Sequence, residues 1–176
     1  TDAPLAPLTT LGCGGHARWL VQVDGPETAR AALAWCRDTG TRSWVLGGGS
    51  NVLVADAGLD GLVLQPAACG REVRPEQAGA VEVRVEAGHS WDALVAWAAA
   101  QGLAGLECLS GIPGRVGAAP IQNIGAYGQS VADCLVAVEA LDCATGELRD
   151  WPAGACGFGY RDSLFKRAAA GRFIVT

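Results

Sequence analysis

Methionine is absent from this 176-residue chain, even at position 1, and histidine occurs only twice. With so few potential ligands, and none of them clustered, the sequence predicts no metal site. No apolar run is long enough to cross a bilayer, and no charged segment followed by an apolar one opens the chain. We therefore predict no membrane association and a cytoplasmic location. Because position 1 is not Met, we expect that the natural start has been trimmed or replaced.

Positive charge is also scarce, since 13 Lys and Arg face 18 Asp and Glu and leave a net charge of −5. Nucleic-acid and membrane-surface binders need a basic footprint, so we predict neither kind of partner. A phosphate-bearing ligand is compatible with this charge, because backbone N–H groups can bind it.

The seven cysteines include no C-x-x-C pair, and an odd number does not suit a disulfide framework. Most of them stand beside apolar residues, as Cys36 does in A-L-A-W-C. We expect free thiols that are buried as small core hydrophobes in a reducing compartment.

What the chain has in abundance is glycine, at 25 residues, within a composition that is 50% hydrophobic. The run from Ile112 to Gly128 reads I-P-G-R-V-G-A-A-P-I-Q-N-I-G-A-Y-G. We predict neither an ordinary helix nor an ordinary strand here, but a backbone against which a flat cofactor lies. The alternative is a Gly/Pro-rich surface loop.

A second glycine-rich stretch, Gly47-Gly48-Gly49-Ser50-Asn51, follows an expected strand over residues 42–46. Contiguous glycines let successive N–H groups point inward and form a concave anion site, to which Ser50 and Asn51 add side-chain donors. The pattern is neither a Rossmann fingerprint nor a P-loop. The alternative is a tight turn between two strands.

Periodicity and turn residues predict a mixed α+β fold. Residues 1–8 look like an extended arm, and residues 70–79 like a strand end and a turn. We place a domain boundary near residues 65–69, between lobes 1–66 and 67–176. Helices are expected over 26–39 and 91–101, and strands over 17–23, 42–46, 62–64, 81–87, 135–141, 147–151 and 172–176.

Two further sites carry chemistry. Tyr160, Arg161, Asp162 and Ser163 stand side by side, and an arginine can grip a carboxylate or phosphate with two hydrogen bonds. The alternative is a structural Tyr-Arg pair at a strand end. His89 is either a ligand or covalent attachment point, or a partly exposed loop histidine.

Three stretches, L-G-G-G-S-N-V-L (46–53), the run 112–128 and F-G-Y-R-D-S-L-F-K (158–166), resemble the UDP-N-acetylenolpyruvoylglucosamine reductase (MurB) family of bacteria. T-T-L-G (9–12) and A-G-H-S-W (87–91) agree with this resemblance. The form Q-N-I-G-A-Y-G is similar to an enterobacterial-like branch of the family.

The resemblance implies a two-lobed α+β FAD-binding fold of the vanillyl-alcohol-oxidase (PCMH) type, with its second lobe truncated and the substrate-binding C-terminal domain absent. It implies non-covalent FAD. The cofactor-binding residues that it implies are Gly47, Gly48, Gly49, Ser50, Asn51, Val52, Leu53, Ile112, Pro113, Gly114, Gly117, Ala118, Ala119, Asn123, Gly125, Ala126 and Val175. Ala118 and Ala119 replace hydroxyl residues of many members, so a hydroxyl contact to the flavin is not expected.

The family reduces a UDP-sugar in peptidoglycan precursor synthesis, with NADPH as the reductant and FAD as the carrier of hydride. Arg161 matches its catalytic arginine, which stabilises charge beside the substrate carboxylate, and Tyr160 and Tyr127 are expected near the substrate. The family's proton-donating serine and assisting C-terminal glutamate have no match here. We therefore expect an inactive fragment, cut within a strand at residues 172–176, that retains FAD weakly.

Two other functions fit the sequence less well. One is a non-catalytic FAD- or nucleotide-binding module that acts with a partner chain. The other is a carbohydrate oxidase or lactate-type dehydrogenase with the same flavin fold. The sequence predicts no oligomeric state.

Overall fold

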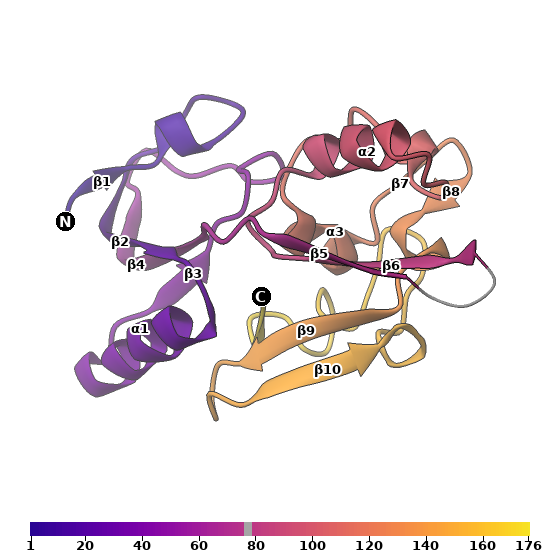
Figure 1. Ribbon diagram of the computed structural model, residues 1–176. Helices are drawn as coiled ribbons and strands as arrows, with labels where there is room; N and C mark the ends of the chain where they lie inside the picture. Colours follow the sequence, from indigo (N-terminus) through magenta and orange to yellow (C-terminus); the bar gives the residue numbers. More distant parts are fainter. Residues whose placement is uncertain (76–78) are drawn as a thin grey trace.

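The computed structural model describes residues 1–75 and 79–176 and has the mixed α+β content that the sequence predicts (Figure 1). The turn expected through residues 76–78 lies outside the described residues. The first third of the chain forms one lobe and the rest a second lobe beside it (Figure 1).

The first lobe is built on a four-stranded sheet. In order across the sheet, its strands are β1 (Ala3–Pro4), β2 (His16–Val23), β4 (Leu59–Pro66) and β3 (Ser43–Val45). Strand β4 runs parallel to both β2 and β3. Its centre, Gly61–Gln65, is buried, as expected for a parallel strand that is covered on both faces. The predicted strands are confirmed, and β4 is longer than expected.

The prediction of an extended arm at the N-terminus is wrong. Strand β1 pairs antiparallel with β2, and a 3-10 turn, η1 (Ala6–Leu8), follows it. Leu5, between the two, is fully buried in a cluster with Ala17, Leu46 and Val63. Strand pairing, the hydrogen bond from the N–H group of Leu5 to the carbonyl of Gly15, and the burial of Leu5 together dock this segment on the sheet.

Helix α1 (Pro26–Thr39) has the predicted ends and the predicted buried face. Ala29, Leu33 and Cys36 are buried at helical spacing. Gly40 ends the helix in the left-handed conformation, at φ 66°, and its N–H group donates to the carbonyl of Cys36. These local signals suffice to define the helix.

The second lobe begins with an antiparallel hairpin and a helix. Strands β5 (Arg71–Pro75) and β6 (Val81–Val85) pair with each other, and helix α2 (Trp91–Ala100) follows. Ser90 caps α2 by accepting a hydrogen bond from the N–H group of Ala93, as predicted. The predicted face of α2 is buried and consists of Trp91, Leu94, Val95 and Ala98.

A three-stranded antiparallel sheet completes this lobe. Its order is β10 (Leu148–Pro152), β9 (Ala137–Asp142) and β11 (Phe173–Val175). The predicted hairpin and the final strand are confirmed. Short elements fill the connections: η3 (Glu107–Leu109), η5 (Val131–Asp133), η6 (Ala153–Ala155), and the paired β7 (Gly125–Ala126) and β8 (Gln129–Ser130).

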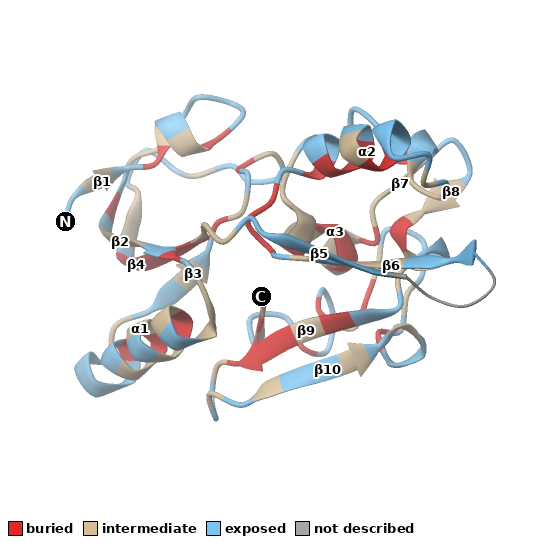
Figure 2. Ribbon diagram, in the orientation of Figure 1, coloured by how far each residue is buried: buried red, intermediate tan, exposed pale blue. Residues whose placement is uncertain are grey.

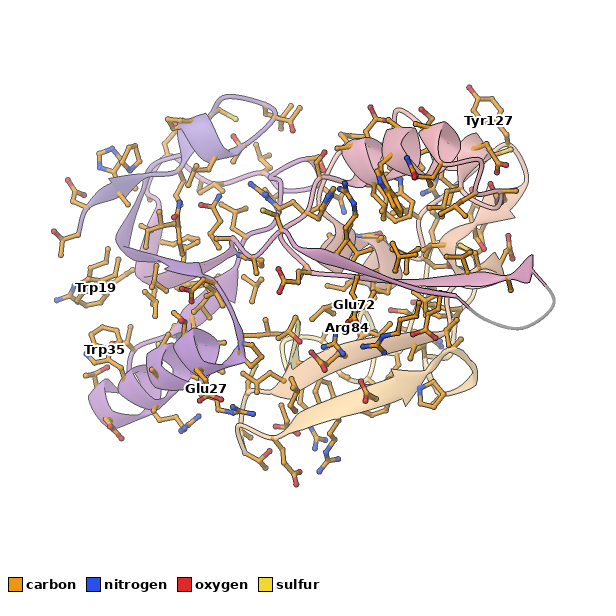
Figure 3. The ribbon with its side chains drawn as sticks, viewed as in Figure 1. Trp19, Glu27, Trp35, Glu72, Arg84 and Tyr127 are labelled. Carbon is orange, nitrogen blue, oxygen red and sulfur yellow. The ribbon has the colours of Figure 1, made fainter. Side chains whose placement is uncertain are left out.

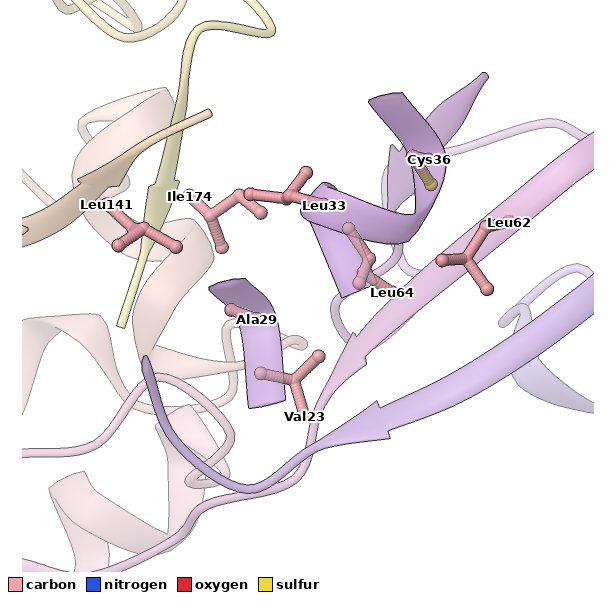
Figure 4. Packing of buried hydrophobic residues seen from close by; sticks show 8 residues of the cluster. All are labelled: Val23, Ala29, Leu33, Cys36, Leu62, Leu64, Leu141 and Ile174. Atoms are coloured by element: carbon pink, nitrogen blue, oxygen red, sulfur yellow. The ribbon is translucent and has the colours of Figure 1, made fainter. Parts of the chain in front are cut away.

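One hydrophobic cluster joins the two lobes. Leu33 of α1 and Leu64 of β4 share a cluster with Leu141 of β9 and Ile174 of β11 (Figure 4). The guanidinium of Arg30 reinforces this contact, because its Nε donates to the carbonyl of Gly146 at 2.8 Å. Figure 2 shows the buried inner side of α1 and the buried strands β4 and β9. The boundary at residues 65–69 stays a prediction, and this cluster crosses it.

Asp142, at the end of β9, is a fully buried carboxylate. It accepts hydrogen bonds from the N–H groups of Ala144 and Thr145 and from the guanidinium of Arg172, whose Nη2 lies 3.0 Å away. Burial opposes ionisation, but these donors outweigh it and lower the pKa of Asp142 below its usual value. The carboxylate therefore joins the hairpin turn after β9 to the start of β11.

The cysteines are only in part the core hydrophobes that the sequence predicts. Cys36 and Cys156 are buried and Cys143 is half-buried, and burial raises the pKa of each of these thiols. The prediction is wrong for the other four, which are exposed: Cys13, Cys69, Cys108 and Cys134. All seven, which lie within the described residues, are free thiols as predicted.

The substitution Asp142→Asn is expected to lower the free energy of unfolding at pH 7 by about 2 kcal/mol, because it weakens hydrogen bonds to a buried charged acceptor. The folded-state pKa is lowered, so the carboxylate stabilises the fold fully above the ordinary carboxyl pKa of about 3.9. That stability is lost as the pH falls through the lowered pKa. Urea unfolding followed by circular dichroism at several pH values measures both effects.

Asp150→Asn on the neighbouring strand β10 is the matched control, because Asp150 is exposed. It should change the free energy of unfolding by less than about 0.5 kcal/mol. An Asp142→Asn deficit that stays the same from pH 7 to the lowest pH at which the protein folds would contradict the assignment.

Candidate cofactor and substrate site

The glycine-rich turn, residues 47–53, leaves strand β3 and precedes β4. Because β3 and β4 are parallel and the connection runs from Val45 to Leu59, it is longer than the tight turn between two strands that was the alternative. Gly49 is in the left-handed region at φ 67°, and a Cβ atom there would collide with the carbonyl oxygen of Leu8. The N–H group of Thr10 donates to the carbonyl of Gly49, which fixes the turn against the N-terminal segment.

The backbone N–H groups of Gly47–Asn51 donate to no other residue in the described part of the chain. Gly48 and Asn51 are exposed, and Gly47 and Ser50 are half-buried. Successive N–H groups left free at a turn form an anion-binding concavity. Val52 and Leu53, at 39% and 76% exposure, extend from this turn into solvent.

The run from Ile112 to Gly128 contains more regular structure than predicted. It holds a 3-10 turn, η4 (Val116–Ala118), a single helical turn, α3 (Ala119–Gln122), and strand β7. The prediction of no ordinary helix or strand is therefore only partly right. The connections between these pieces need unusual backbone conformations, which are left-handed at Gly114, Asn123, Tyr127 and Gly128.

The glycines of this run pack against the chain itself. A Cβ atom at Gly117 would lie 2.6 Å from Cβ of Ala87, and one at Gly125 would lie 2.7 Å from the carbonyl oxygen of Gln129. The sequence reasoning assigned these glycines to contact with a cofactor. The close partners that the structure gives them are protein atoms.

Backbone hydrogen bonds fix the run against the segment that precedes helix α2. The N–H groups of Val116 and Gly117 donate to the carbonyls of His89 and Ala87, both at 2.9 Å. In return, the N–H group of Trp91 donates to the carbonyl of Gly114 at 3.1 Å. Ile112 packs onto the core under α2.

The glycine-rich turn touches this run directly. A Cβ atom at Gly48 would lie 3.0 Å from Cα of Gly114, and one at Gly47 would lie 3.8 Å from Cβ of Ala118. The Ser50 hydroxyl donates to the carbonyl of Pro113 at 3.3 Å. The two stretches that the sequence analysis proposed for the cofactor are thus brought together, although more than 60 residues separate Ser50 from Pro113 along the chain.

The Tyr160–Arg161 segment joins the other end of the run. Nη2 of Arg161 donates to the carbonyl of Gly125 at 2.6 Å, and Nδ2 of Asn123 donates to the carbonyl of Gly159 at 2.8 Å. Asn123 is buried and its Oδ1 also accepts from the N–H group of Ala132. The buried Asn123 amide therefore fixes the backbone directly before Tyr160 and Arg161.

The side chains proposed for the substrate are exposed. Tyr160 is 94% and Tyr127 is 90% exposed, and Arg161 is an exposed residue in the left-handed region at φ 52°. Figure 3 shows Tyr127 projecting from the surface beyond α2. The arginine is held by a carbonyl oxygen, so its charge is not neutralised by that contact.

Two cavities lie near the run but not along the turn. One, of about 460 Å³, is lined by Gly117, Ala119, Val175 and apolar residues of β6, α2 and β9. The other, of about 200 Å³, lies between the lobes, where Leu64 of β4 faces Ile174 and Val175 of β11. None of the residues Gly47–Leu53 lines either cavity, so neither cavity is lined by all of the proposed cofactor-binding residues.

His89 is buried at 8% exposure, so the prediction of a partly exposed loop histidine is wrong. Its Nδ1 donates to the carbonyl of Ser90 at 2.8 Å, and its Nε2 accepts from Nη1 of Arg71 at 3.3 Å. The Arg71 guanidinium in turn stacks on Trp97, 4.6 Å from the ring centre. Both ring nitrogens are engaged, which leaves neither free for a ligand or a covalent bond.

Neither a metal cluster nor a membrane span is present within residues 1–75 and 79–176. No group of three His, Cys, Asp or Glu residues there could hold a metal ion. No helix there is long and apolar enough to cross a membrane.

Arg115, inside the run, is not among the predicted site residues. Its Nη1 donates to the carbonyl of Gly88, and its backbone pairs with that of Ser90. The sequence feature that distinguishes Arg115 is its position as a single cation among small apolar residues, directly before Val116 and Gly117.

Comparison with known proteins identifies the fold. A family model described as "FAD binding domain" matches residues 17–151. A crystal structure of UDP-N-acetylenolpyruvylglucosamine reductase (MurB) from Thermus caldophilus superposes with a TM-score of 0.76 at 35% identity, over 98% of this chain and 57% of that one. A solvent-stable cholesterol oxidase matches at a TM-score of 0.61 and 16% identity, over 85% of this chain and 32% of that one. That second likeness concerns the fold alone, and it agrees with the predicted FAD-binding fold of the vanillyl-alcohol-oxidase type.

Curated relatives are more similar in sequence. The UDP-N-acetylenolpyruvoylglucosamine reductase of Pseudomonas putida is 47% identical over 171 residues, which is 97% of this chain and 50% of the relative. The chain thus spans about half the length of the curated relatives it matches. The chain belongs to the FAD-binding domain family, and its curated relatives there are UDP-N-acetylenolpyruvoylglucosamine reductases.

Proposed function

We propose that this chain is the FAD-binding part of a MurB-type reductase, which converts UDP-N-acetylglucosamine enolpyruvate to UDP-N-acetylmuramate with NADPH in peptidoglycan precursor synthesis. The observation that carries the proposal is the contact between the glycine-rich turn and the run, where Gly48 meets Gly114. The relatives at 44–49% identity are named as reductases of UDP-N-acetylenolpyruvoylglucosamine, which supports the proposed substrate. NADPH is proposed as the reductant from the family resemblance of the three sequence stretches.

The residues at this contact fit FAD. Free N–H groups of Gly47–Asn51 suit the pyrophosphate, and the lack of a side chain at Gly48 lets the turn pack directly against Gly114 of the run. We propose non-covalent attachment, because both nitrogens of the His89 ring are already engaged. FAD, when bound, would supply the hydride-transfer chemistry.

We propose that Arg161 binds the substrate carboxylate and stabilises the negative charge that develops beside it. One of its nitrogens holds the Gly125 carbonyl, and a guanidinium has further donors in the same plane for a carboxylate. Preorganised donors aimed at developing charge lower the barrier most when they do not need to reorient. Tyr160 directly precedes Arg161, and Tyr127 lies two residues after Gly125, whose carbonyl Arg161 contacts; both tyrosines are exposed and are proposed to contact the UDP-sugar.

We further propose that these 176 residues do not complete the reaction by themselves. Protonation of the carbon beside the carboxylate needs a general acid. The sequence has no G-S-F-F-K-N-P-like segment to supply the family's serine.

The seven free thiols support a cytoplasmic location, which we also propose.

The chain is expected to retain FAD, although weakly. After incubation with FAD and gel filtration, the protein fraction should show the flavin absorbance bands, and acid precipitation should release all of the flavin. The substitution Gly48→Val places side-chain atoms against Gly114 and is expected to weaken FAD binding by roughly tenfold or more.

The control is Gly154→Val, because a Cβ atom at Gly154 would meet no atom of a non-neighbouring residue within 4 Å. Circular dichroism of both variants separates a loss of binding from a loss of folding. A colourless protein fraction after addition of FAD would refute this part of the proposal.

No turnover is expected from the chain alone. With NADPH, FAD and UDP-N-acetylglucosamine enolpyruvate, chromatography should detect no UDP-N-acetylmuramate above a protein-free control, because the protonation step lacks its acid. Robust product formation by these 176 residues would show that the required groups are all present in the chain.

A further inference from the structure

Arg115 lies where the glycine-rich turn meets the run. It directly follows Gly114, and its Cγ is 3.6 Å from the position that a Cβ atom of Gly48 would take. The backbone of Arg115 pairs with that of Ser90, which fixes the root of its side chain. The side chain of Arg115 therefore starts beside Gly48, in the turn whose N–H groups have no acceptor among the described residues.

The guanidinium of Arg115 has unused donors. Nη1 donates to the carbonyl of Gly88, but Nε is buried and has no acceptor among the described residues. An arginine has five N–H donors, and a buried donor is ordinarily paired. This side chain therefore has capacity for a further acceptor.

No carboxylate of the described residues neutralises this cation. Arg84 pairs with Glu139 at 2.7 Å and Arg172 pairs with Asp142 at 3.0 Å, whereas Arg115 takes part in no ion pair in the described part of the chain. The chain is acidic overall, with a net charge of −5. An unneutralised, half-buried cation beside an anion-binding turn suits an anionic ligand.

We propose that Arg115 binds the pyrophosphate of FAD together with the backbone N–H groups of Gly47–Asn51. This inference rests on the proposed binding of FAD at the turn. Arg115 supplies the positive charge there, and the turn supplies neutral donors. The contact with the Gly88 carbonyl fixes one nitrogen of the guanidinium. The competing explanation is that Arg115 only ties Gly88 to the run.

Four probes separate these explanations: FAD and ADP contain a pyrophosphate, whereas riboflavin and adenosine contain no phosphate. Isothermal titration of Arg115→Met is expected to give dissociation constants for FAD and ADP that are raised roughly tenfold or more. The constants for riboflavin and adenosine should stay within about twofold of the wild-type values. The dependence of FAD binding on salt concentration should become shallower, because one charge is lost.

Two further variants complete the test. Arg115→Lys keeps the positive charge and is expected to recover most of the ADP affinity and the salt dependence. Arg149→Met removes an exposed arginine from strand β10 of the same lobe, away from the turn, and should leave all four constants unchanged. Thermal melting of each variant reports its folding.

If Arg115→Met raised the dissociation constants of all four probes equally, or left the constant for ADP unchanged, the proposed role of Arg115 would be overturned. The proposal that the chain binds FAD would still stand. If the wild-type chain itself binds neither FAD nor ADP, the proposed function fails together with this inference. The two failures are therefore distinguishable.

Discussion

The approach of two glycine backbones, Gly48 and Gly114, is the constraint on which the candidate site depends. A single methyl group at Gly48 would lie 3.0 Å from Cα of Gly114, closer than side chains ordinarily pack. Any larger residue would push the turn away from the run. The proposed binding of FAD uses both stretches, and this contact places the N–H groups of Gly47–Asn51 beside the backbone of Ile112–Gly128.

The rest of the structure holds this contact from several directions. The run is fixed at one end by the backbone of Ala87–Trp91 and at the other by the buried amide of Asn123. The turn is fixed by Gly49 and Thr10. Because Leu33 and Leu64 share a core with Leu141 and Ile174, the two lobes are packed against each other rather than tethered by a flexible linker (Figure 4). The geometry of the site therefore depends on apolar packing remote from it.

Much of the fold could be predicted from the sequence because its signals are local. The spacing of Ala29, Leu33 and Cys36, with Gly40 behind them, defines α1, and alternating valines define β6. The three stretches of the candidate site could also be singled out from the sequence, because clustered glycines and an Arg next to a Tyr are visible in the sequence itself. The resemblance to a known family then added the cofactor, which spacing alone did not give.

What could not be predicted depends on partners distant in the chain. The burial of Leu5 needs a sheet face completed by Val63, and the burial of His89 needs Arg71 on another strand. Cys69, Cys108 and Cys134 each have an apolar neighbour in the sequence and are nevertheless exposed, because neighbours in sequence do not fix which way a side chain points. The glycines Gly117 and Gly125 were read as cofactor contacts, but their tight neighbours are Ala87 and Gln129.

The most direct test of the central claim is the amide spectrum of the ¹⁵N-labelled chain during titration with FAD. The account predicts that the largest shifts fall on the N–H groups of Gly47–Asn51 and on the segment around Gly114, because the ligand lies where these two stretches touch. Saturable shifts confined to the residues that line the 460 Å³ cavity, with the glycine-rich turn unchanged, would contradict it.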